Sequence, residues 1–258
     1  MLFAFMNACW FLGVGLNKVA PWGLVIGLSA LLGCQSQPSA DRPHAALNPP
    51  PPIAIATSNP PAISRPAVPP APESGGPWRT LFDGKTLAGW AETDFAGRGP
   101  VKVSEGKLIL GTGLMTGVTW TNAADLPRIN YEIALDAMRV DGSDFFCALT
   151  FPVKEDPCSF IVGGWGGGVV GLSSLDGQDA SNNDTTRYMN FDNGQWYALR
   201  VRVTETNLQC WIDSDKVVDV ETKDRRISIR SEVEDSRPLG IASWSTTAAL
   251  RNIRLRKL

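Results

Sequence analysis

Histidine is nearly absent from this sequence, since His44 is the only one among 258 residues. It lies in a proline-rich stretch whose composition predicts no packed structure. The sequence therefore predicts that imidazole takes no part in catalysis or metal binding in the rest of the chain.

An excess of one charge and a pattern of paired cysteines are also missing. The formal net charge is -2 and the basic residues are not interleaved with aromatic ones, so nucleic acid is not an expected partner. Of the five cysteines, Cys9 falls in an N-terminal leader and Cys34 in a lipidation motif. Cys147, Cys158 and Cys210 form no Cys-x-x-Cys pair and are expected to be buried free thiols, with a disulfide as the open alternative.

Residues 1–33 are almost wholly apolar, and Lys18 is their only charge. Lys18 and the following VAPWGLVIGLSALLG resemble the basic and hydrophobic regions of a secretory signal. That hydrophobic region has about fifteen residues, fewer than the roughly twenty that span a membrane. The ending LLGC resembles a bacterial lipobox, which predicts a signal peptide over 1–33 and a lipidated Cys34. The alternative is an uncleaved N-terminal anchor, because the apolar run 1–16 precedes Lys18.

Residues 34–77 are predicted to form a tether. Thirteen of the nineteen prolines fall in 35–77, together with many alanines and serines. Such a segment buries too little apolar surface to offset its ordering entropy, so a disordered, partly polyproline II linker is expected. A lipid on Cys34 would hold the rest of the chain near a membrane, which predicts an exported protein of the cell envelope, at the outer membrane or in the periplasm.

From Trp78 to Leu258 the sequence changes to short runs of alternating polarity, separated by turn residues. No stretch keeps a 3.6-residue period over three turns. Hairpin turns are predicted at Glu105–Gly106 and Ser214–Asp215, and a bulge at Arg251–Asn252. The predicted strands cover 79–83, 101–104, 107–112, 115–121, 129–140, 144–153, 158–165, 196–205, 208–213, 216–221, 227–232, 239–244 and 248–257.

About a dozen strands in roughly 180 residues predict a single all-β domain of two packed sheets, a sandwich or jelly roll. The glycines at 166, 168 and 171 match G-x-G-x-x-G, the pattern of a dinucleotide-binding turn. That turn requires a helix to begin at the third glycine, whereas here LSSLDGQDASNND follows, with the character of a loop. The glycines instead predict a strand whose backbone a ligand or a facing strand approaches closely.

Three stretches near the ends of 78–258 carry a resemblance to a known family. WRTLFDGKTLAGW opens the domain, and NGQWYALRVRVTETNLQCWIDSDKVVDV with PLGIASWSTTAALRNIRLRKL closes it. They resemble the 3-keto-disaccharide hydrolases, in which a Gly-x-Trp-Tyr strand and an Arg-Asn-Ile-Arg-Leu terminal strand recur. The resemblance implies a concanavalin A-like jelly-roll sandwich of two antiparallel sheets. The proline-tethered lipoprotein form resembles secreted proteins of planctomycete-type bacteria.

The resemblance also implies hydrolysis of a 3-keto-glycoside. A ketone at C3 makes the C2 proton acidic, so a general base can remove it and the C1 substituent is expelled before water adds back. Family members commonly carry a histidine just before the terminal strand, where this chain reads Ile-Ala-Ser-Trp-Ser at 241–245. A non-catalytic carbohydrate-binding or adhesion module, or a structural surface protein, therefore stays open as an alternative.

Asp144 and two tryptophans are candidates for a sugar site. Asp144 opens the predicted strand DFFCALTFPV with parity opposite to Phe145 and Cys147, so it either faces away from the core or bonds its own turn. Trp165 lies among glycines and Trp244 lies in the segment where the family has histidine. Indole rings stack on the C–H faces of sugars, and packing in the core is the alternative.

Arg230 and Glu232 alternate onto one face of the predicted strand 227–232, either as an enolate clamp and a base or as a surface ion pair. The loop 176–187 concentrates oxygen-bearing side chains that suit sugar hydroxyls, Ca²⁺ or another divalent metal, or simply solvent, and its spacing is not that of an EF-hand. The predicted catalytic residues are Asp144, Asp179, Arg230 and Glu232. The predicted substrate-binding residues are Trp165, Asp176, Asn182, Arg187 and Trp244, and no metal ligand is assigned.

Overall fold

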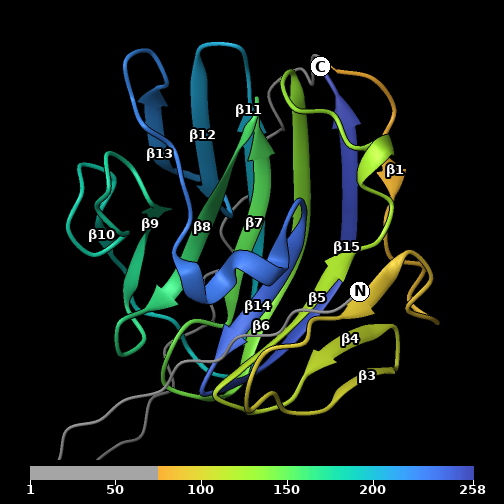
Figure 1. The fold of residues 1–258 in the computed structure, drawn as a ribbon. Helices are drawn as coiled ribbons and strands as arrows, with labels where there is room; N and C mark the ends of the chain where they lie inside the picture. The colour runs from red at the N-terminus through yellow and green to blue at the C-terminus, as the bar shows by residue number, and fades with distance from the viewer. Residues whose placement is uncertain (1–74) are drawn as a thin grey trace, which may run out of the picture. The chain divides into compact units, whose positions relative to one another are not determined.

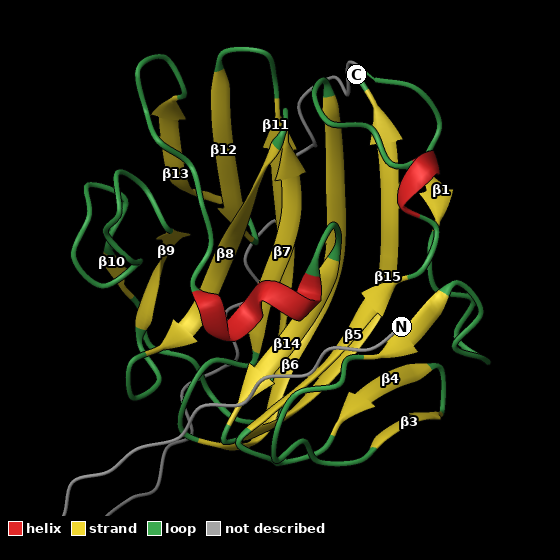
Figure 2. Ribbon diagram, in the orientation of Figure 1, coloured by secondary structure: helices red, strands yellow, loops and turns green. Residues whose placement is uncertain are grey.

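The computed structural model describes residues 75–258, which form two antiparallel β-sheets packed face to face (Figures 1 and 2). The leader, Cys34 and most of the proline-rich tether lie outside the described residues. Sheet A has eight strands in the order β13-β12-β11-β6-β15-β4-β3, with β1 pairing to β15. Sheet B has seven strands in the order β10-β9-β8-β7-β14-β5-β2. The prediction of an all-β jelly-roll sandwich is confirmed.

The strands of sheet A are β1 (Arg79–Thr80), β3 (Val101–Ser104), β4 (Lys107–Leu110), β6 (Tyr131–Gly142), β11 (Trp196–Val203), β12 (Asn207–Ile212), β13 (Asp215–Glu221) and β15 (Thr246–Lys257). Those of sheet B are β2 (Trp90–Glu92), β5 (Met115–Trp120), β7 (Cys147–Val153), β8 (Asp156–Gly164), β9 (Val169–Ser173), β10 (Arg187–Tyr188) and β14 (Gly240–Trp244). Two short 3-10 segments, η1 (Ala123–Asp125) and η2 (Ser231–Ser236), complete the elements.

Strict alternation builds the core between the sheets. On β11 every second residue from Tyr197 to Val203 is buried, and on β8 Cys158, Phe160 and Val162 point inward. The three cysteines of the described range are buried free thiols, as predicted. Burial raises the pKa of each thiol, that of Cys158 to about 12. These thiols are therefore protonated at neutral pH and are poor nucleophiles.

Both predicted hairpin turns are present, and one of them is displaced by one residue. Glu105 and Gly106 have φ values of 52° and 76°, as a tight two-residue hairpin requires. In the second hairpin the turn lies at 213–214, one residue earlier than predicted, with Asp213 at φ 53°. The bulge near Arg251 is confirmed by a register shift between Arg251 and Arg254.

Three sequence predictions about local structure are wrong. The segment 227–232 is not a strand; it leads into η2, which lies against β5 and β14. The strand predicted from Asp144 begins only at Cys147, so Phe145 leaves the core and packs on the outer side of sheet B beside Trp244. Strands β2, β9 and β10 were not predicted, because they are short or rich in glycine and serine.

The glycine-rich stretch forms the hairpin from β8 to β9. Its turn contains Trp165 at φ 49°, and Gly171 lies inside β9 rather than at a helix start. A Cβ at Gly171 would lie 3.1 Å from the carbonyl oxygen of Ala180 and from the hydroxyl of Thr185. The loop after β9 therefore folds back onto this strand, so the close approach to the backbone is made by a loop and not by the ligand or facing strand that was predicted.

The outer face of sheet A is covered by arginines stacked on tryptophans. Arg200 lies 4.0 Å from the ring centre of Trp211, and Arg251 lies 4.0 Å from that of Trp196. Glu132 has no exposed surface and accepts hydrogen bonds from Arg200, Arg202 and Arg256. The expectation that basic and aromatic residues are not interleaved is wrong for this face, because pairing joins strands far apart in sequence. The absence of a nucleic-acid partner stays a prediction.

Candidate functional site

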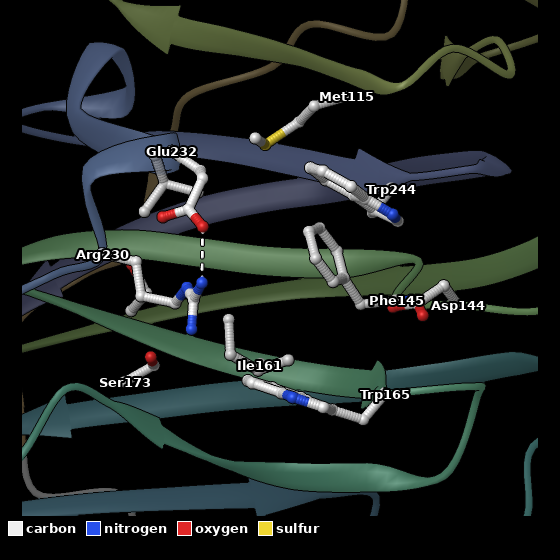
Figure 3. A pocket seen from close by; sticks show the side chains of 11 residues that line it. Met115, Asp144, Phe145, Ile161, Trp165, Ser173, Arg230, Glu232 and Trp244 are labelled. Carbon is white, nitrogen blue, oxygen red and sulfur yellow. Dashed lines mark hydrogen bonds and ion pairs between the residues drawn. The ribbon is translucent and has the colours of Figure 1, made fainter. Parts of the chain in front are cut away.

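The outer face of sheet B holds a pocket of about 210 Å³ (Figure 3). Its position follows from alternation, because β8 sends Ser159 and Ile161 outward between the inward residues of its core face. The apolar part of the lining is Met115, Phe145, Ile161, Trp165, Val233 and Trp244. The polar part is Asp144, Ser159, Ser173, Arg230 and Glu232.

Aromatic rings form one side of this pocket. Phe145 and Trp244 lie 6.4 Å apart between ring centres, with their planes tilted by 43°. Trp165 faces the pocket from the β8–β9 turn and keeps 44% of its surface exposed (Figure 3). An exposed indole beside a cavity offers an apolar plane on which the C–H face of a ring can stack.

Asp144 fixes the turn that carries Trp165. Its Oδ2 accepts a hydrogen bond from the backbone N–H of Gly166 at 3.0 Å. Its Oδ1 accepts one from the N–H of Phe145 at 2.7 Å, so this aspartate also bonds its own turn. Both oxygens keep lone pairs for a ligand, since each carboxylate oxygen can accept more than one hydrogen bond.

Arg139 supports the same turn from the core side. Its buried guanidinium donates to the carbonyl oxygen of Gly167 at 2.8 Å and lies 5.3 Å from the ring centre of Phe146. Burial lowers the pKa of Arg139, and the nearby charge of Asp144 partly offsets this. The wall formed by Trp165 is therefore held in place from both sides.

Arg230 and Glu232 bring charge to the opposite side of the pocket. Arg230 Nη2 donates to Glu232 Oε1 (Figure 3). Arg230 Nη1 donates to Asp179 Oδ2 at 2.9 Å. The hydrogen bond from Arg230 lowers the pKa of Glu232 below its ordinary value of 4.5, and it raises the pKa of Arg230. Both side chains are therefore charged at neutral pH.

This arrangement suits a ring with an apolar face and a polar edge. The aromatic planes and the carboxylate of Asp144 meet one side of the cavity, while the guanidinium of Arg230 and the carboxylate of Glu232 meet the other (Figure 3). A volume of about 210 Å³ lies below the roughly 300–1,000 Å³ of drug-sized ligand sites, so the pocket accepts about one small ring.

The model of the 3-keto-alpha-glucoside-1,2-lyase-like domain matches residues 77–256. The chain belongs to this family. The match confirms the resemblance carried by the two ends of the domain. A comparison with curated proteins finds no match.

Several solved structures are similar to this lyase-like domain at low sequence identity. The Crh5 transglycosylase in complex with NAG is 12% identical with a TM-score of 0.50, over 71% of this chain and 84% of the other. The carbohydrate-binding module CBM66 from Bacillus subtilis is 13% identical with a TM-score of 0.46, over 66% and 96%. Domain 4 of AbnA, a GH43 extracellular arabinanase from Geobacillus stearothermophilus in complex with arabinotriose, is 12% identical with a TM-score of 0.44, over 65% and 82%.

The lyase-like domain brings five of the nine predicted site residues to its pocket, namely Asp144, Trp165, Arg230, Glu232 and Trp244. Asp179 stands behind the pocket, where its carboxylate holds Arg230 and the hydroxyl of Ser181. The other three predicted contacts, Asp176, Asn182 and Arg187, are exposed and do not line the pocket.

The acidic loop after β9 pairs with arginine instead of converging on a centre. Arg225 donates to the carboxylate of Asp176 at 2.7 Å and also to that of Asp184. Within residues 75–258, no group of three or more His, Cys, Asp or Glu side chains is placed to hold a metal ion. In the same range no helix is long and apolar enough to cross a membrane.

Sequence reasoning missed six of the lining residues, which are Met115, Phe145, Ser159, Ile161, Ser173 and Val233. For Ser159 and Ile161 the signal was present, because they alternate with the core residues of β8. For Phe145 the alternation with Cys147 wrongly predicted a core position. The residues before β7 are not in a strand, so Phe145 lies on the outer side of sheet B.

Proposed function

We propose that this protein is an exported enzyme that cleaves 3-keto-glycosides by base-assisted elimination followed by addition of water. The observation that carries the proposal is the Arg230–Glu232 pair facing aromatic walls in a one-ring pocket. Membership of the 3-keto-alpha-glucoside-1,2-lyase-like family supports the same chemistry.

In the proposed reaction Glu232 is the base and Arg230 stabilises the enolate. The carboxylate of Glu232 takes the C2 proton, and the C2–H electrons form the enolate whose oxygen, formerly the C3 carbonyl, is bound by Arg230. The carbonyl then re-forms as the C1–C2 double bond develops and the C1–O bond breaks, and the departing alkoxide takes a proton from water. The hydroxide left from that water adds to C1 and the protonated Glu232 returns its proton to C2, which completes hydrolysis and regenerates the carboxylate.

The Arg230–Glu232 ion pair suits a reaction in which negative charge moves from Glu232 to the substrate oxygen. In the free protein Arg230 lowers the pKa of Glu232 and so weakens it as a base. As negative charge develops on the substrate oxygen, the guanidinium shifts its interaction towards that oxygen, and the basicity of Glu232 rises. Asp179 keeps Arg230 in position throughout, because it bonds the other nitrogen of the guanidinium.

The test is the release of a chromogenic C1 substituent from p-nitrophenyl 3-keto-α-glucoside by the purified full-length protein. We expect release by the wild type, and none from the same glucoside without the C3 ketone, because its C2 proton is not acidic. Absence of release from the 3-keto substrate, with and without added divalent metal ions, would overturn the proposal.

A non-catalytic carbohydrate-binding module is the second candidate. It is favoured by the engagement of both pocket carboxylates, since Glu232 is paired with Arg230 and Asp144 with two backbone N–H groups. Saturable sugar binding without release would support this module. Neither binding nor release would favour a structural surface protein.

We also propose that the protein is lipid-anchored through Cys34 and resides in the cell envelope, because LLGC follows an apolar segment. Mass spectrometry of the mature protein should find a modified cysteine at its N-terminus. A Cys34→Ala variant should lose membrane association. A mature chain that still contains residues 1–33 would support the uncleaved anchor instead.

A further inference from the structure

Tyr188 exposes 78% of its surface, the largest fraction among the big hydrophobic side chains in the part of the chain that the structure describes. It lies on β10, the edge strand of sheet B. A tyrosine ring left open at a sheet edge offers an apolar plane with a hydroxyl at its tip, which suits a ligand that is itself both apolar and polar.

The register places Tyr188 on the same side of sheet B as the pocket. Tyr188 is paired with Val169, and side chains directly opposite each other in antiparallel strands share a face. Val169 belongs to the outer apolar cluster that also contains Ile161 and Phe145. The alternation agrees, because the next residue, Met189, packs against the core between the sheets.

Tyr188 also continues the row of residues that leads out of the pocket. Val169 pairs with Gly164 on one side and with Tyr188 on the other, so two strand spacings, about 10 Å, separate Gly164 from Tyr188. Trp165 follows Gly164 directly and forms the pocket wall at this end. Trp165 and Tyr188 are therefore exposed aromatic side chains on either side of Val169, which is itself buried.

We propose that Tyr188 is a second sugar-binding subsite, and that the ligand is a glycan of at least two rings that leaves the pocket past Trp165 and stacks its next ring on Tyr188. This inference rests on the proposed function, because it needs the first ring in the pocket. It adds the substrate class: an oligosaccharide bound by its end rather than a single glycoside. The span from the pocket wall to Tyr188 is that of a short saccharide.

The test compares the affinity of the full-length protein for methyl α-glucoside and for maltotriose, by calorimetry. Neither probe has a C3 ketone, so neither is cleaved and the titration measures binding alone. We expect the wild type to bind maltotriose more tightly than the single ring. Tyr188→Ala should weaken maltotriose binding by about tenfold and leave methyl α-glucoside unchanged, because aromatic contacts of this kind contribute on that order.

Two control variants sharpen the comparison. Tyr188→Phe keeps the ring and should retain most of the added affinity. Val140→Ala removes another exposed apolar side chain, on β6 of sheet A, and should change neither titration. Equal maltotriose affinity in the wild type and Tyr188→Ala, with methyl α-glucoside still bound, would overturn the subsite and leave the pocket standing. Failure of the wild type to bind either probe would overturn the pocket and the subsite together.

Discussion

The outer faces of the two sheets carry the same residue types, namely tryptophan, arginine and acidic residues, in different roles. On sheet A, Trp196 and Trp211 are each covered by an arginine at 4.0 Å, and Glu132 is sealed beneath three arginines. On sheet B, Trp165 and Trp244 border an open pocket. One face completes its interactions within the protein, and the other leaves part of them for a ligand.

The difference comes from where the side chains are attached. Trp196 and Trp211 belong to long paired strands, and other strands of sheet A supply an arginine beside each ring. Arg200 on the adjacent β11 covers Trp211, and Arg251 on β15, two strands away, covers Trp196. Trp165 lies on a turn and Arg230 immediately precedes η2, so neither has a strand neighbour to cover it. Irregular backbone carries Trp165 and Arg230 to the pocket, whereas Trp244 reaches it from the last residue of β14.

The largest expected effect is on turnover. Glu232→Gln keeps the size of the side chain and removes the base, so release of the C1 substituent should fall by about 10²- to 10⁴-fold. The free energy of unfolding should change by less than about 1 kcal/mol, since the pair with Arg230 is partly exposed. Initial rates and a urea denaturation curve measure the two quantities. Undiminished turnover would remove Glu232 from the proposed mechanism.

On sheet A the matched change should act on stability instead. Glu132→Gln leaves three arginines without their buried carboxylate, and the free energy of unfolding should fall by about 3–5 kcal/mol. Affinity for methyl α-glucoside should stay at the wild-type value in the protein that remains folded. A loss of affinity without a loss of stability would contradict the division between the two faces.

Tryptophan substitutions on the two sheets should differ in their effect on ligand affinity, and these effects should be smaller than those of the glutamate substitutions. Trp165→Ala removes the exposed pocket wall and should weaken methyl α-glucoside binding by about tenfold. Trp211→Ala removes a ring on sheet A that Arg200 and Arg202 contact, and should leave the same titration unchanged. If both variants lose affinity equally, the effect is not specific to the pocket.

The smallest expected effect is the change of stability and turnover with pH. Because Arg230 lowers the pKa of Glu232, the ionised pair contributes stability above the ordinary glutamate value of 4.5 and loses it as pH falls through the lower folded-state pKa. Turnover should be flat between about pH 5 and pH 8 and fall only in more acidic solution, since no histidine lies within residues 75–258. An inflection near pH 6.5 would point to a different base.

The sandwich could be predicted because its strands alternate in polarity, as β11 and β15 do, and such a pattern fixes both the strand and its buried face. The ends of elements could not. ISIRSE alternates like a strand, yet Val233 anchors the following residues against sheet B and η2 results. The bounds of strand β9 could not be predicted, because VVGLSS has the composition of a loop as much as of a strand.

The site could be predicted only in part. Trp165 was chosen because it lies among glycines, and Trp244 because it lies in the segment where the family has histidine; both line the pocket. Asp176 was chosen for its oxygen atoms, but it bonds Arg225, which lies 49 residues further along the chain. Such long-range partners decide whether an acidic loop is free for a ligand, and local sequence does not contain them.

The indole N–H signals of the tryptophans test the central claim most directly. The chain has nine tryptophans, and their signals can be assigned by single substitution in a ¹⁵N-labelled sample titrated with methyl α-glucoside. We predict that the signals of Trp165 and Trp244 shift and saturate together, while those of Trp196 and Trp211 stay in place. Shifts confined to Trp196 and Trp211 would contradict the assignment of the ligand site to sheet B.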